Sequence, residues 1–371
     1  MNNFLSKTFD SFFKKEVGSV IGLDIGSSSV KIVQLKKKKG RAVLETYGEI
    51  AIGPYANQEI GRATNLSLDK LSEAILDLIK EANVTSNVCC TSIPITSSLI
   101  SFIKVPDLGE KKLAEIIPLE ARKYIPVPTS EVTIDYWVIP TEESAFSEFQ
   151  SSAKILDEKI KNVLLVVVHN DAKSKNDQLM KMSGLVAASS EIELFSTIRA
   201  VTEPGLETQM ILDFGARTTK IYIIDRGILR ASNIVNRGGQ DITLAISRSL
   251  GLSFDEAERI KKSTPGGSVI RDVSDLSSVN LDFIFSEVKR VIVNYQKNYN
   301  KNISKVFLTG GGANLKGLNE SVKVALDLPV EKGNPFGKLE YPAFLENVLK
   351  SVGPEFTVAI GLALRQLLDN D

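Results

Sequence analysis

Histidine and cysteine are scarce in this chain of 371 residues, and their scarcity excludes several kinds of chemistry. His169 is the only histidine, which argues against a Ser-His-Asp or Cys-His mechanism and against a histidine-based zinc site. The two cysteines, Cys89 and Cys90, are adjacent in an apolar stretch. Adjacent cysteines rarely bridge, and two are too few for a four-ligand metal site. This cysteine usage is typical of a reducing cytosolic compartment.

The chain also lacks net charge and long apolar runs. Its 45 basic and 45 acidic residues cancel, so there is no global basic field for nucleic acid, and no nucleic-acid partner is expected. No stretch is apolar for about 18 residues and no signal-peptide pattern is present, so the sequence predicts neither a membrane span nor export. The overall composition, 43% apolar and 24% charged, is that of a soluble globular chain.

Residues 1–17 form an N-terminal tail in which apolar pairs (Phe4/Leu5, Phe12/Phe13) alternate with lysines. One interpretation is a short helix that lies on a membrane or a partner. The other is a tail that is disordered or docks on its own domain. The second is favoured because one or two turns of helix are marginal alone.

The most informative feature that is present is a glycine loop that occurs twice. Residues 22–35 read GLDIGSSSVKIVQL and residues 211–224 read ILDFGARTTKIYII. Each copy is an apolar strand, then Asp-x-Gly, then small hydroxyl residues, then a second apolar strand. This pattern predicts a β-hairpin whose turn holds phosphate. The two aspartates are 189 residues apart (213 − 24), which indicates two similar halves that grip one nucleotide.

The residue types in each copy match that role. A glycine lets backbone N–H groups come close to a phosphate, and hydroxyls add donors. An aspartate there would repel phosphate unless a cation intervenes, so Asp24 and Asp213 suit a hydrated Mg²⁺. Lys31 and Lys220 could approach the phosphates, but a solvent-facing lysine on the following strand is the favoured interpretation of each. The predicted phosphate contacts are Gly26, Ser27, Ser28 and Ser29 in the first copy and Gly215, Thr218 and Thr219 in the second.

A third glycine-rich segment follows both loops. Residues 306–318 read VFLTGGGANLKGL, an apolar strand that leads through three glycines into a helix. Such a junction leaves a flat surface and free N–H groups, which suit an adenine ring and its phosphates. The residues predicted to bind there are Gly310, Gly311, Gly312 and Asn314.

The order of these three segments resembles the actin/Hsp70/sugar-kinase superfamily. Within it, the chain is similar to the PilM family, actin-like proteins of type IV pilus assembly that are relatives of the division protein FtsA. The resemblance runs from about Gly18 to Gln366, and its family-specific stretches are Arg122–Pro128 and Gly238–Lys261. The glycine loops alone indicate only the superfamily.

The resemblance implies an α/β fold of actin-like (ribonuclease H-like) duplicated domains with a small α+β insertion called 1C. The expected parts are subdomain 1A at 18–87 and 162–205, subdomain 1C at 88–161, subdomains 2A and 2B at 206–355, and a C-terminal helix, 356–371, that returns to 1A. Strands are expected in 1C at Val88–Pro94, Leu99–Val105 and Val132–Ile139, and in 1A at Val163–Val168. A helix is expected at Leu179–Ala188 and a polar loop at Ser263–Ser278.

Further site residues are implied by the resemblance. Gly238 and Gly239 open a helix after a strand, where such a pair lets backbone approach the nucleotide. Glu258 and Lys261 share a helix face and would bind the ribose and flank the adenine; the alternative is a surface salt bridge. A water-orienting group for hydrolysis would come from the region of Glu191 and Glu193. These two are more simply explained as helix-start charges, so the sequence predicts ATP binding with at most slow hydrolysis.

The resemblance also implies a cellular role. The chain would be a cytoplasmic ATP-binding protein of the type IV pilus, or related type II secretion, inner-membrane platform. A groove between 1A and 1C would bind the cytoplasmic N-terminal peptide of PilN. Partners, among them other platform proteins, would hold the chain at the inner face of the membrane, where copies could form a ring or filament.

Two other classes are open. An FtsA-like division protein usually ends in an amphipathic membrane helix, whereas this chain ends LRQLLDND directly after its core. A sugar or acetate kinase needs a catalytic aspartate in the first domain, and none stands out between Leu35 and Val163.

Overall fold

The computed structural model describes residues 18–107, 109–139, 160–263 and 271–368, and the predicted N-terminal tail lies outside these ranges. The chain divides into two compact units. The main unit comprises the residues up to Ser92 together with those from Leu179 onward, and the inserted unit is Ile93–Gln178. Across the described ranges, no helix has the length and apolarity to cross a membrane.

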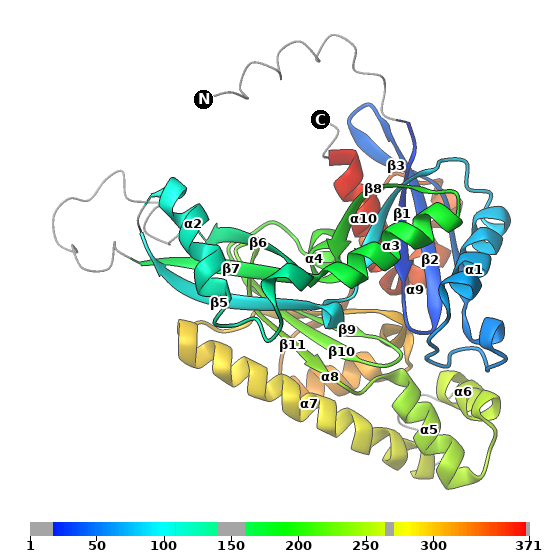
Figure 1. Cartoon of the computed structure of the whole chain (residues 1–371). Coiled ribbons are helices and arrows are strands. Elements are labelled where there is room, and N and C mark those ends of the chain that lie inside the picture. Colours follow the sequence, from blue (N-terminus) through cyan, green and yellow to red (C-terminus); the bar gives the residue numbers. More distant parts are fainter. Residues whose placement is uncertain (1–17, 108, 140–159, 264–270, 369–371) are drawn as a thin grey trace. The chain divides into compact units, whose positions relative to one another are not determined.

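The main unit contains a first five-stranded sheet in the order β3-β2-β1-β4-β8 (Figure 1). The strand β1 pairs antiparallel with β2 and parallel with β4. Alternate residues of β1 point to opposite faces, so Ile21 and Leu23 pack on one side and Val20 on the other. The strands are β1 (Val20–Ile25), β2 (Ser29–Lys38), β3 (Arg41–Ala51), β4 (Val88–Ile93) and β8 (Val186–Ile192).

Helices cover both faces of this sheet. Ser67 caps α1 by accepting a hydrogen bond from the backbone N–H of Lys70, and Ile75 and Leu78 pack on one face. On the other face, α10 packs so closely that a Cβ on Gly22 would lie 1.9 Å from the carbonyl oxygen of Ala359. The helices of the main unit around the first sheet are α1 (Leu68–Glu81), α4 (Glu193–Val201), α9 (Glu346–Val352) and α10 (Thr357–Leu368), and Leu179 and Met180 at the end of α3 (Asn170–Met182) also pack there.

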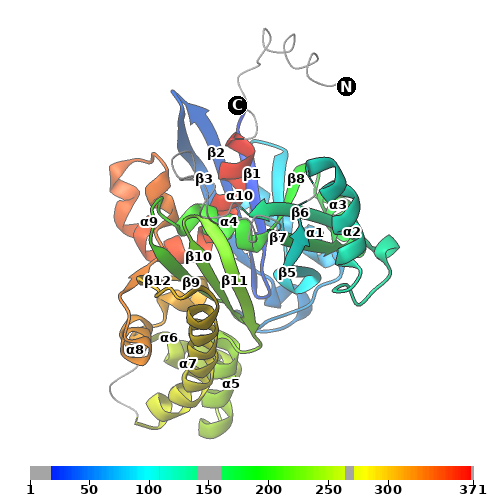
Figure 2. The ribbon, with the colours of Figure 1, turned by 90° about the vertical axis from the view of Figure 1, so that its left-hand side faces the viewer.

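A second five-stranded sheet repeats the topology of the first, in the order β11-β10-β9-β12-β13 (Figure 2). As in the first sheet, the leading strand β9 pairs antiparallel with the next strand, β10, and parallel with a later one, β12. The duplication expected from the two glycine loops is therefore present in the strand order. The strands are β9 (Thr208–Phe214), β10 (Thr219–Asp225), β11 (Ile228–Val235), β12 (Lys305–Thr309) and β13 (Val330–Lys332).

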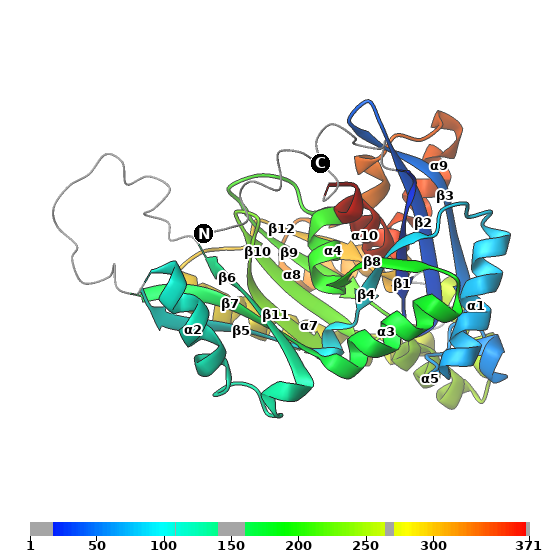
Figure 3. The ribbon, with the colours of Figure 1, turned by 45° about the horizontal axis from the view of Figure 1, so that its top comes forward.

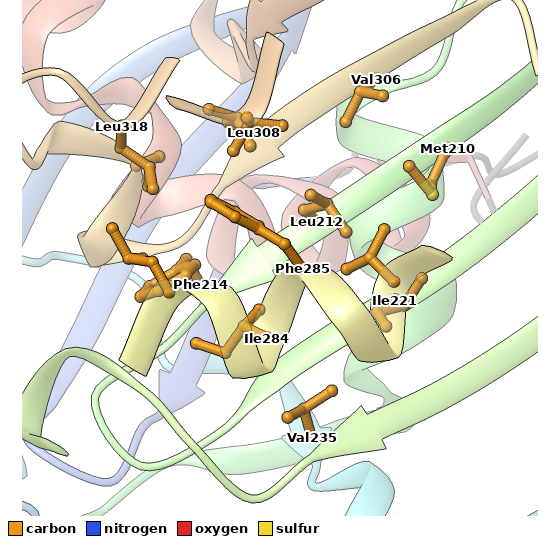
Figure 4. Close-up of a cluster of buried hydrophobic side chains, with 14 of the residues drawn as sticks. Met210, Leu212, Phe214, Ile221, Val235, Ile284, Phe285, Val306, Leu308 and Leu318 are labelled. Atoms are coloured by element: carbon orange, nitrogen blue, oxygen red, sulfur yellow. The ribbon is translucent and has the colours of Figure 1, made fainter. Parts of the chain in front are cut away.

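The core of the second half lies between this sheet and the long helix α7. Figure 4 shows Met210, Leu212 and Phe214 of β9 beside Ile284 and Phe285 of α7, and all five side chains are buried. The helices of this half are α5 (Gly239–Leu250), α6 (Phe254–Ser263), α7 (Arg271–Tyr299) and α8 (Leu318–Leu326).

The inserted unit contains a three-stranded antiparallel sheet in the order β5-β7-β6 with the helix α2 packed on it, and most of α3 (Figure 3). Leu113 and Ile117 of the helix pack on Val163 and Leu165 of the central strand. The elements are β5 (Ser98–Pro106), α2 (Glu110–Ala121), β6 (Val132–Ile139) and β7 (Ile160–His169).

The structure corrects four of the expected elements. The strand at Val88–Ile93 belongs to the first five-stranded sheet and not to the insertion, whereas Val163–Val168 is the central strand of the inserted unit and not of 1A. The compact insertion is therefore Ile93–Gln178 and not 88–161. The helix expected at Leu179–Ala188 ends at Met182, and strand β8 begins at Val186. Of the loop expected at Ser263–Ser278, residues 271–278 are helical, and 264–270 lie outside the described ranges.

Candidate functional site

The two glycine loops form hairpin turns with the same geometry. In the first, the backbone N–H of Gly26 donates to the carbonyl oxygen of Ser29 at 3.0 Å; in the second, Gly215 donates to Thr218 at 3.0 Å. A Cβ on either glycine would lie 2.9 Å from that same oxygen, so each turn requires glycine. The strand register is also shared, because Asp24 pairs with Lys31 and Asp213 pairs with Lys220.

Both turns line one cavity of about 620 Å³ in the main unit. The cavity is built from the first turn, the second turn, the start of α5, part of α6 and the glycine-rich segment after β12. Most of the predicted site residues line it: Asp24, Gly26, Ser27, Ser28, Ser29, Lys31, Asp213, Gly215, Thr218, Gly239, Glu258, Lys261, Gly310, Gly311, Gly312 and Asn314.

The glycine-rich segment packs directly on the second turn. Gly310 has a φ of 78°, and a Cβ there would lie 2.4 Å from Oδ1 of Asp213. A Cβ on Gly312 would lie 2.3 Å from Cδ1 of Phe214. Glycine is therefore needed at both positions to bring this backbone against the carboxylate end of β9.

The electrostatics of the two aspartates differ. Burial raises the pKa of Asp24 to about 6, and the charge of Glu193 adds to this; the attraction of Lys31 and Lys220 and a hydrogen bond from Ser92 oppose it. The Ser92 hydroxyl donates to Oδ1 of Asp24 at 3.0 Å. In contrast, Asp213 forms an ion pair with Lys220, with 3.2 Å between Oδ2 and Nζ. A buried carboxylate whose ionised form is disfavoured fits the requirement for a bound cation.

The expectation that the two lysines face solvent is wrong. Lys31 is 9% exposed, and its Nζ lies 2.9 Å from Oε1 of Glu49 and 2.6 Å from Oγ of Ser29. Nζ of Lys220 lies 2.6 Å from Oε2 of Glu193. Both side chains leave their strand on the cavity side, where the carboxylates of Glu49 and Glu193 offset the cost of desolvating the ammonium groups.

Glu258 and Lys261 form an ion pair, with 2.6 Å between Oε2 and Nζ, but the pair is buried and lines the cavity instead of lying on the surface. The hydroxyl of Thr243 also donates to Oε2 of Glu258 at 2.6 Å. Burial acts to raise the pKa of Glu258, but Lys261, the hydrogen bond from Thr243 and the charge of Lys262 together outweigh it, so the pKa is lowered. Lys261 also donates to the carbonyl oxygen of Gly239 at 3.1 Å, which joins α6 to the start of α5.

Three predicted residues do not line the cavity. The Thr219 hydroxyl donates to the carbonyl oxygen of Arg237 at 2.9 Å. Gly238 caps α5, where a Cβ would lie 2.6 Å from the carbonyl oxygens of Gly215 and Ala216. Glu191 is held by Arg199 through two 2.7 Å contacts, away from the cavity, whereas Glu193 both opens α4 and lines the cavity.

Sequence reasoning missed a pair of glutamates in the cavity wall. Burial acts to raise the pKa of Glu49, but the charge of Lys31 and hydrogen bonds with Ser29, Lys31 and Glu355 together outweigh it, and the pKa is lowered. The pKa of Glu355 is raised, first by burial and then by the charge of Glu49. Oε1 of Glu355 accepts a 2.7 Å hydrogen bond from Asn314. A chain of contacts therefore links the first hairpin to the glycine-rich segment. The one sequence signal for it was that Glu49 and Lys31 are cross-strand neighbours.

A segment after β3, residues 57–66, joins the two halves of the main unit, and we call it the clasp. On one side, the backbone N–H of Thr64 donates to the carbonyl oxygen of Ser27 in the first turn at 2.8 Å. On the other side, the N–H of Ala63 donates to Oε1 of Gln240 in α5 at 2.6 Å. The guanidinium of Arg62 also lies 5.1 Å from the ring centroid of Phe254 in α6.

Two sheets of repeated topology, each with a glycine turn on a shared cavity, define an actin-like duplicated fold. The family model described as "Type IV pilus assembly protein PilM" matches residues 22–367. The chain belongs to this family.

The curated relatives include cell division proteins FtsA. The Neisseria meningitidis protein is 25% identical over 92% of this chain and 88% of its own length, and the Staphylococcus epidermidis protein is 23% identical over 90% and 78%. The match to the Rhizobium meliloti FtsA, 24% identical, spans half of this chain and 46% of that protein.

Solved structures have the same fold. A PilM–PilN type IV pilus biogenesis complex matches with a TM-score of 0.77 and 24% identity over 95% of this chain and 99% of that one. The ethanolamine utilization protein EutJ of Carboxydothermus hydrogenoformans gives 0.54, with 16% identity over 95% and 91%. MreB5 of Spiroplasma citri bound to ADP gives 0.50, with 10% identity over 96% and 98%.

Proposed function

We propose that the main unit binds ATP with Mg²⁺ in the cavity between the two hairpin turns. The observation that carries this proposal is the shared geometry of the two turns, whose glycines and small hydroxyl residues line one cavity. Backbone N–H groups of such turns bind phosphate oxygens. That the fold is also found in an MreB5 structure with ADP supports the proposal.

The residues present fit each part of the nucleotide. Asp24 and Asp213 supply two carboxylates for the Mg²⁺, which would neutralise phosphate charge. Gly310 to Gly312 and Asn314 would face the adenine, and Glu258 with Lys261 would bind the ribose. The cavity volume is within the range of small-molecule sites.

Hydrolysis is slow in this proposal. Attack on the terminal phosphate needs a group that orients water. Glu193 is the carboxylate of the predicted pair that lines the cavity, but its Oε2 already lies 2.6 Å from Nζ of Lys220. A carboxylate that is already bound to an ammonium group is less available to orient water, so bound ATP would persist and act as a structural ligand.

The nucleotide proposal is tested by titration calorimetry of ATP–Mg²⁺ into Gly310→Ala. The new methyl would overlap the carboxylate of Asp213, so we expect at least a tenfold weaker Kd, roughly 1.4 kcal/mol. Gly205→Ala is the matched control, because the nearest atom to its Cβ is 4.0 Å away. Unchanged affinity in a folded Gly310→Ala protein would refute the proposed site. If Gly310→Ala fails to fold, Asp213→Asn gives the same test without a steric change.

We further propose that the protein acts in the inner-membrane assembly platform of type IV pili, or of a related secretion system, and binds the cytoplasmic N-terminal peptide of PilN. The chain would then lie at the inner face of the membrane through that partner, with other platform proteins or further copies beside it. Membership of the PilM family and the likeness to a PilM–PilN complex support this role.

The inserted unit has a face that suits a peptide. Phe102, Leu164 and Trp137 are direct neighbours across β5, β7 and β6, on the opposite side of the sheet from Leu165, which packs with α2. Leu164 at the centre of this row is buried, and the accessible side chain of the face is Trp137 on the edge strand, which is 47% exposed. Exposed aromatic side chains of this kind commonly anchor a partner.

The peptide proposal is tested by calorimetric titration of the ATP–Mg²⁺-loaded chain with a synthetic PilN N-terminal peptide. Binding on the order of micromolar Kd is expected, and Trp137→Ala should weaken it about tenfold. Phe344→Ala, which removes an aromatic side chain that is 81% exposed in the main unit, should leave the Kd unchanged. If the folded, nucleotide-loaded wild-type chain does not bind, the pilus role fails and the FtsA-like alternative gains support.

A further inference from the structure

Glu355 lies against the glycine-rich segment that is proposed to face the base. It belongs to a short 3₁₀ helix, Gly353–Phe356, which precedes α10. In this helix the carbonyl oxygen of Pro354 accepts a 2.9 Å hydrogen bond from the N–H of Gly310. A Cβ on Gly311 would lie 3.9 Å from Cγ of Glu355. The side chain of Glu355 therefore runs along the glycine-rich segment, and it lines the cavity.

The carboxyl group of Glu355 is held in place by Asn314. Its Oε1 accepts a 2.7 Å hydrogen bond from Nδ2 of Asn314. The orientation of that amide agrees with a second contact, 3.4 Å between its Oδ1 and Nζ of Lys332. Oε1 of Glu355 is thus an acceptor, and a carboxyl oxygen has a second lone pair for a further donor.

Glu49 supports this arrangement from the first hairpin. Its Oε1 lies 2.9 Å from Nζ of Lys31. Burial, and then the charge of Glu49, raises the pKa of Glu355. The pKa of Glu49 is lowered, because the charge of Lys31 and the hydrogen bonds of Glu49 together outweigh its burial. Of the two carboxyl groups, Glu355 therefore holds a shared proton more readily, which leaves its Oε1 as an acceptor.

The two common purines differ at the position that such an acceptor would contact. Adenine carries an amino group at C6, which is a donor, and guanine carries O6, which is an acceptor. A fixed carboxyl oxygen attracts the amino group and repels O6. A site built to hydrogen-bond a ligand group rejects an analogue that lacks it, since the polar group of the site is then left without its partner.

We propose that Glu355 selects adenine over guanine by accepting a hydrogen bond from the 6-amino group through Oε1. Asn314 is then the residue that positions the carboxyl group. The inference rests on the proposed nucleotide site and adds to it the residue that determines which base is bound. The other carboxylate proposed to contact the nucleoside is Glu258, but its Oε2 is held by Lys261 and Thr243 at 2.6 Å each. Glu258 also belongs to α6 and not to the wall formed by the glycine-rich segment.

The test is titration calorimetry with the Mg²⁺ complexes of three triphosphates. These are ATP, inosine triphosphate, which carries a carbonyl oxygen in place of the amino group, and purine riboside triphosphate, which carries hydrogen there. For the wild type we expect inosine triphosphate to bind at least about 100-fold more weakly than ATP, and purine riboside triphosphate about tenfold more weakly. In Glu355→Ala no acceptor is left, so ATP and purine riboside triphosphate should have the same Kd to within about twofold.

Glu355→Gln is a second variant that nearly preserves the shape of the side chain. Its amide can turn the NH₂ group toward a carbonyl oxygen, so inosine triphosphate should bind within about tenfold of ATP. Glu346→Ala is the matched control, because it removes a carboxylate of α9 that pairs with Lys350 at 2.6 Å and does not line the cavity. The Kd ratios of this control should equal those of the wild type.

The ratios separate base selection from a structural role. If Glu355→Ala and Glu355→Gln weaken all three triphosphates by the same factor, the residue only supports the cavity wall, and the inference is overturned. Equal affinity of the wild type for ATP and inosine triphosphate would also overturn it, while the nucleotide site would stand. A folded wild-type chain that binds none of the three would instead refute the nucleotide site itself, and with it this inference.

Discussion

Asp24 is unfavourably placed in the metal-free protein, since burial raises its pKa to about 6 from an ordinary 3.8. A carboxyl group with a raised pKa in the folded state contributes stability that is present below the unfolded pKa and is lost as the pH rises through 6. Above that pH the folded protein must either hold a buried carboxylate without full compensation or take up a cation. The residue that suits Mg²⁺ binding is therefore one that destabilises the fold when the metal is removed.

The first prediction concerns this residue. In EDTA at pH 8, Asp24→Asn should increase the free energy of unfolding by about 1–3 kcal/mol, because it removes the buried charge. At about pH 2.5, well below both the folded and the unfolded pKa of Asp24, the group is protonated in both states and the increase should vanish. Urea unfolding at the two pH values measures the difference. Asp282→Asn, an exposed change in α7, should alter neither value, and an Asp24→Asn protein that is less stable at pH 8 would contradict the argument.

At the scale of single residues, the sequence could predict the contacts that occur in both copies of the glycine loop. It could not predict contacts that occur once, between segments far apart in the chain. Gly26 and Gly215 could be recognised because the same turn requires glycine for the same backbone reason in both copies. Glu355 could not, because it is 306 residues from Glu49 (355 − 49) and reaches it only after the last helix folds back on the first sheet. The burial of Lys31 was missed for a related reason, because its ion partner Glu49 is on another strand.

At the scale of elements, α10 fixes the first half of the main unit through close backbone contacts. A Cβ on Gly361 would lie 2.0 Å from the carbonyl oxygen of Ser196 in α4, and a Cβ on Gly22 would lie 1.9 Å from that of Ala359. Both glycines let the helix lie against its neighbours without side chains between them. The helix therefore tolerates no added atom at Gly361.

The second prediction follows from this packing. Glycine to alanine in a helix interior ordinarily stabilises by about 1 kcal/mol. Gly361→Ala should instead lower the free energy of unfolding by about 1–3 kcal/mol or more, because α10 must move away from α4. Urea unfolding at pH 7 is the measurement, and Gly205→Ala, in open space, is the control. A stabilised Gly361→Ala protein would show that the contact is not close in solution.

The elements that were assigned wrongly share one cause. The residue pattern of a segment predicts that it forms a strand, but it does not predict which other strands pair with it. Both Val88–Ile93 and Val163–Val168 were recognised as strands, but their sheets were exchanged, because both are apolar and lie next to the insertion boundaries. The strand Val186–Ile192 was missed because its first residues, Val-Ala-Ala-Ser-Ser, are small, and its first three are exposed. Neither helical nor alternating periodicity is visible in such a run.

At the scale of the whole main unit, residues of both halves line the cavity, and the clasp connects the two halves through hydrogen bonds. The carbonyl oxygen of Ser27 in the first turn accepts a hydrogen bond from the N–H of Thr64 in the clasp, and Oε1 of Gln240 in α5 accepts one from the N–H of Ala63. A nucleotide that contacts both turns would be released only when the halves separate. Contacts of the clasp should therefore slow nucleotide release even where they do not touch the nucleotide.

The third prediction tests this role of the clasp. Arg62 does not line the cavity, but its guanidinium packs over Phe254, so Arg62→Ala should speed nucleotide release by about twofold to tenfold, the range of a contact worth 0.5–1.5 kcal/mol. Gln240→Ala should have a similar effect. Stopped-flow displacement of a fluorescent ATP analogue measures the rate. Arg290→Ala, which breaks a surface pair with Glu287 on α7, should leave the rate unchanged. If Gln240→Ala alone speeds release, Gln240 acts by direct contact with the nucleotide, and the clasp does not hold the halves together.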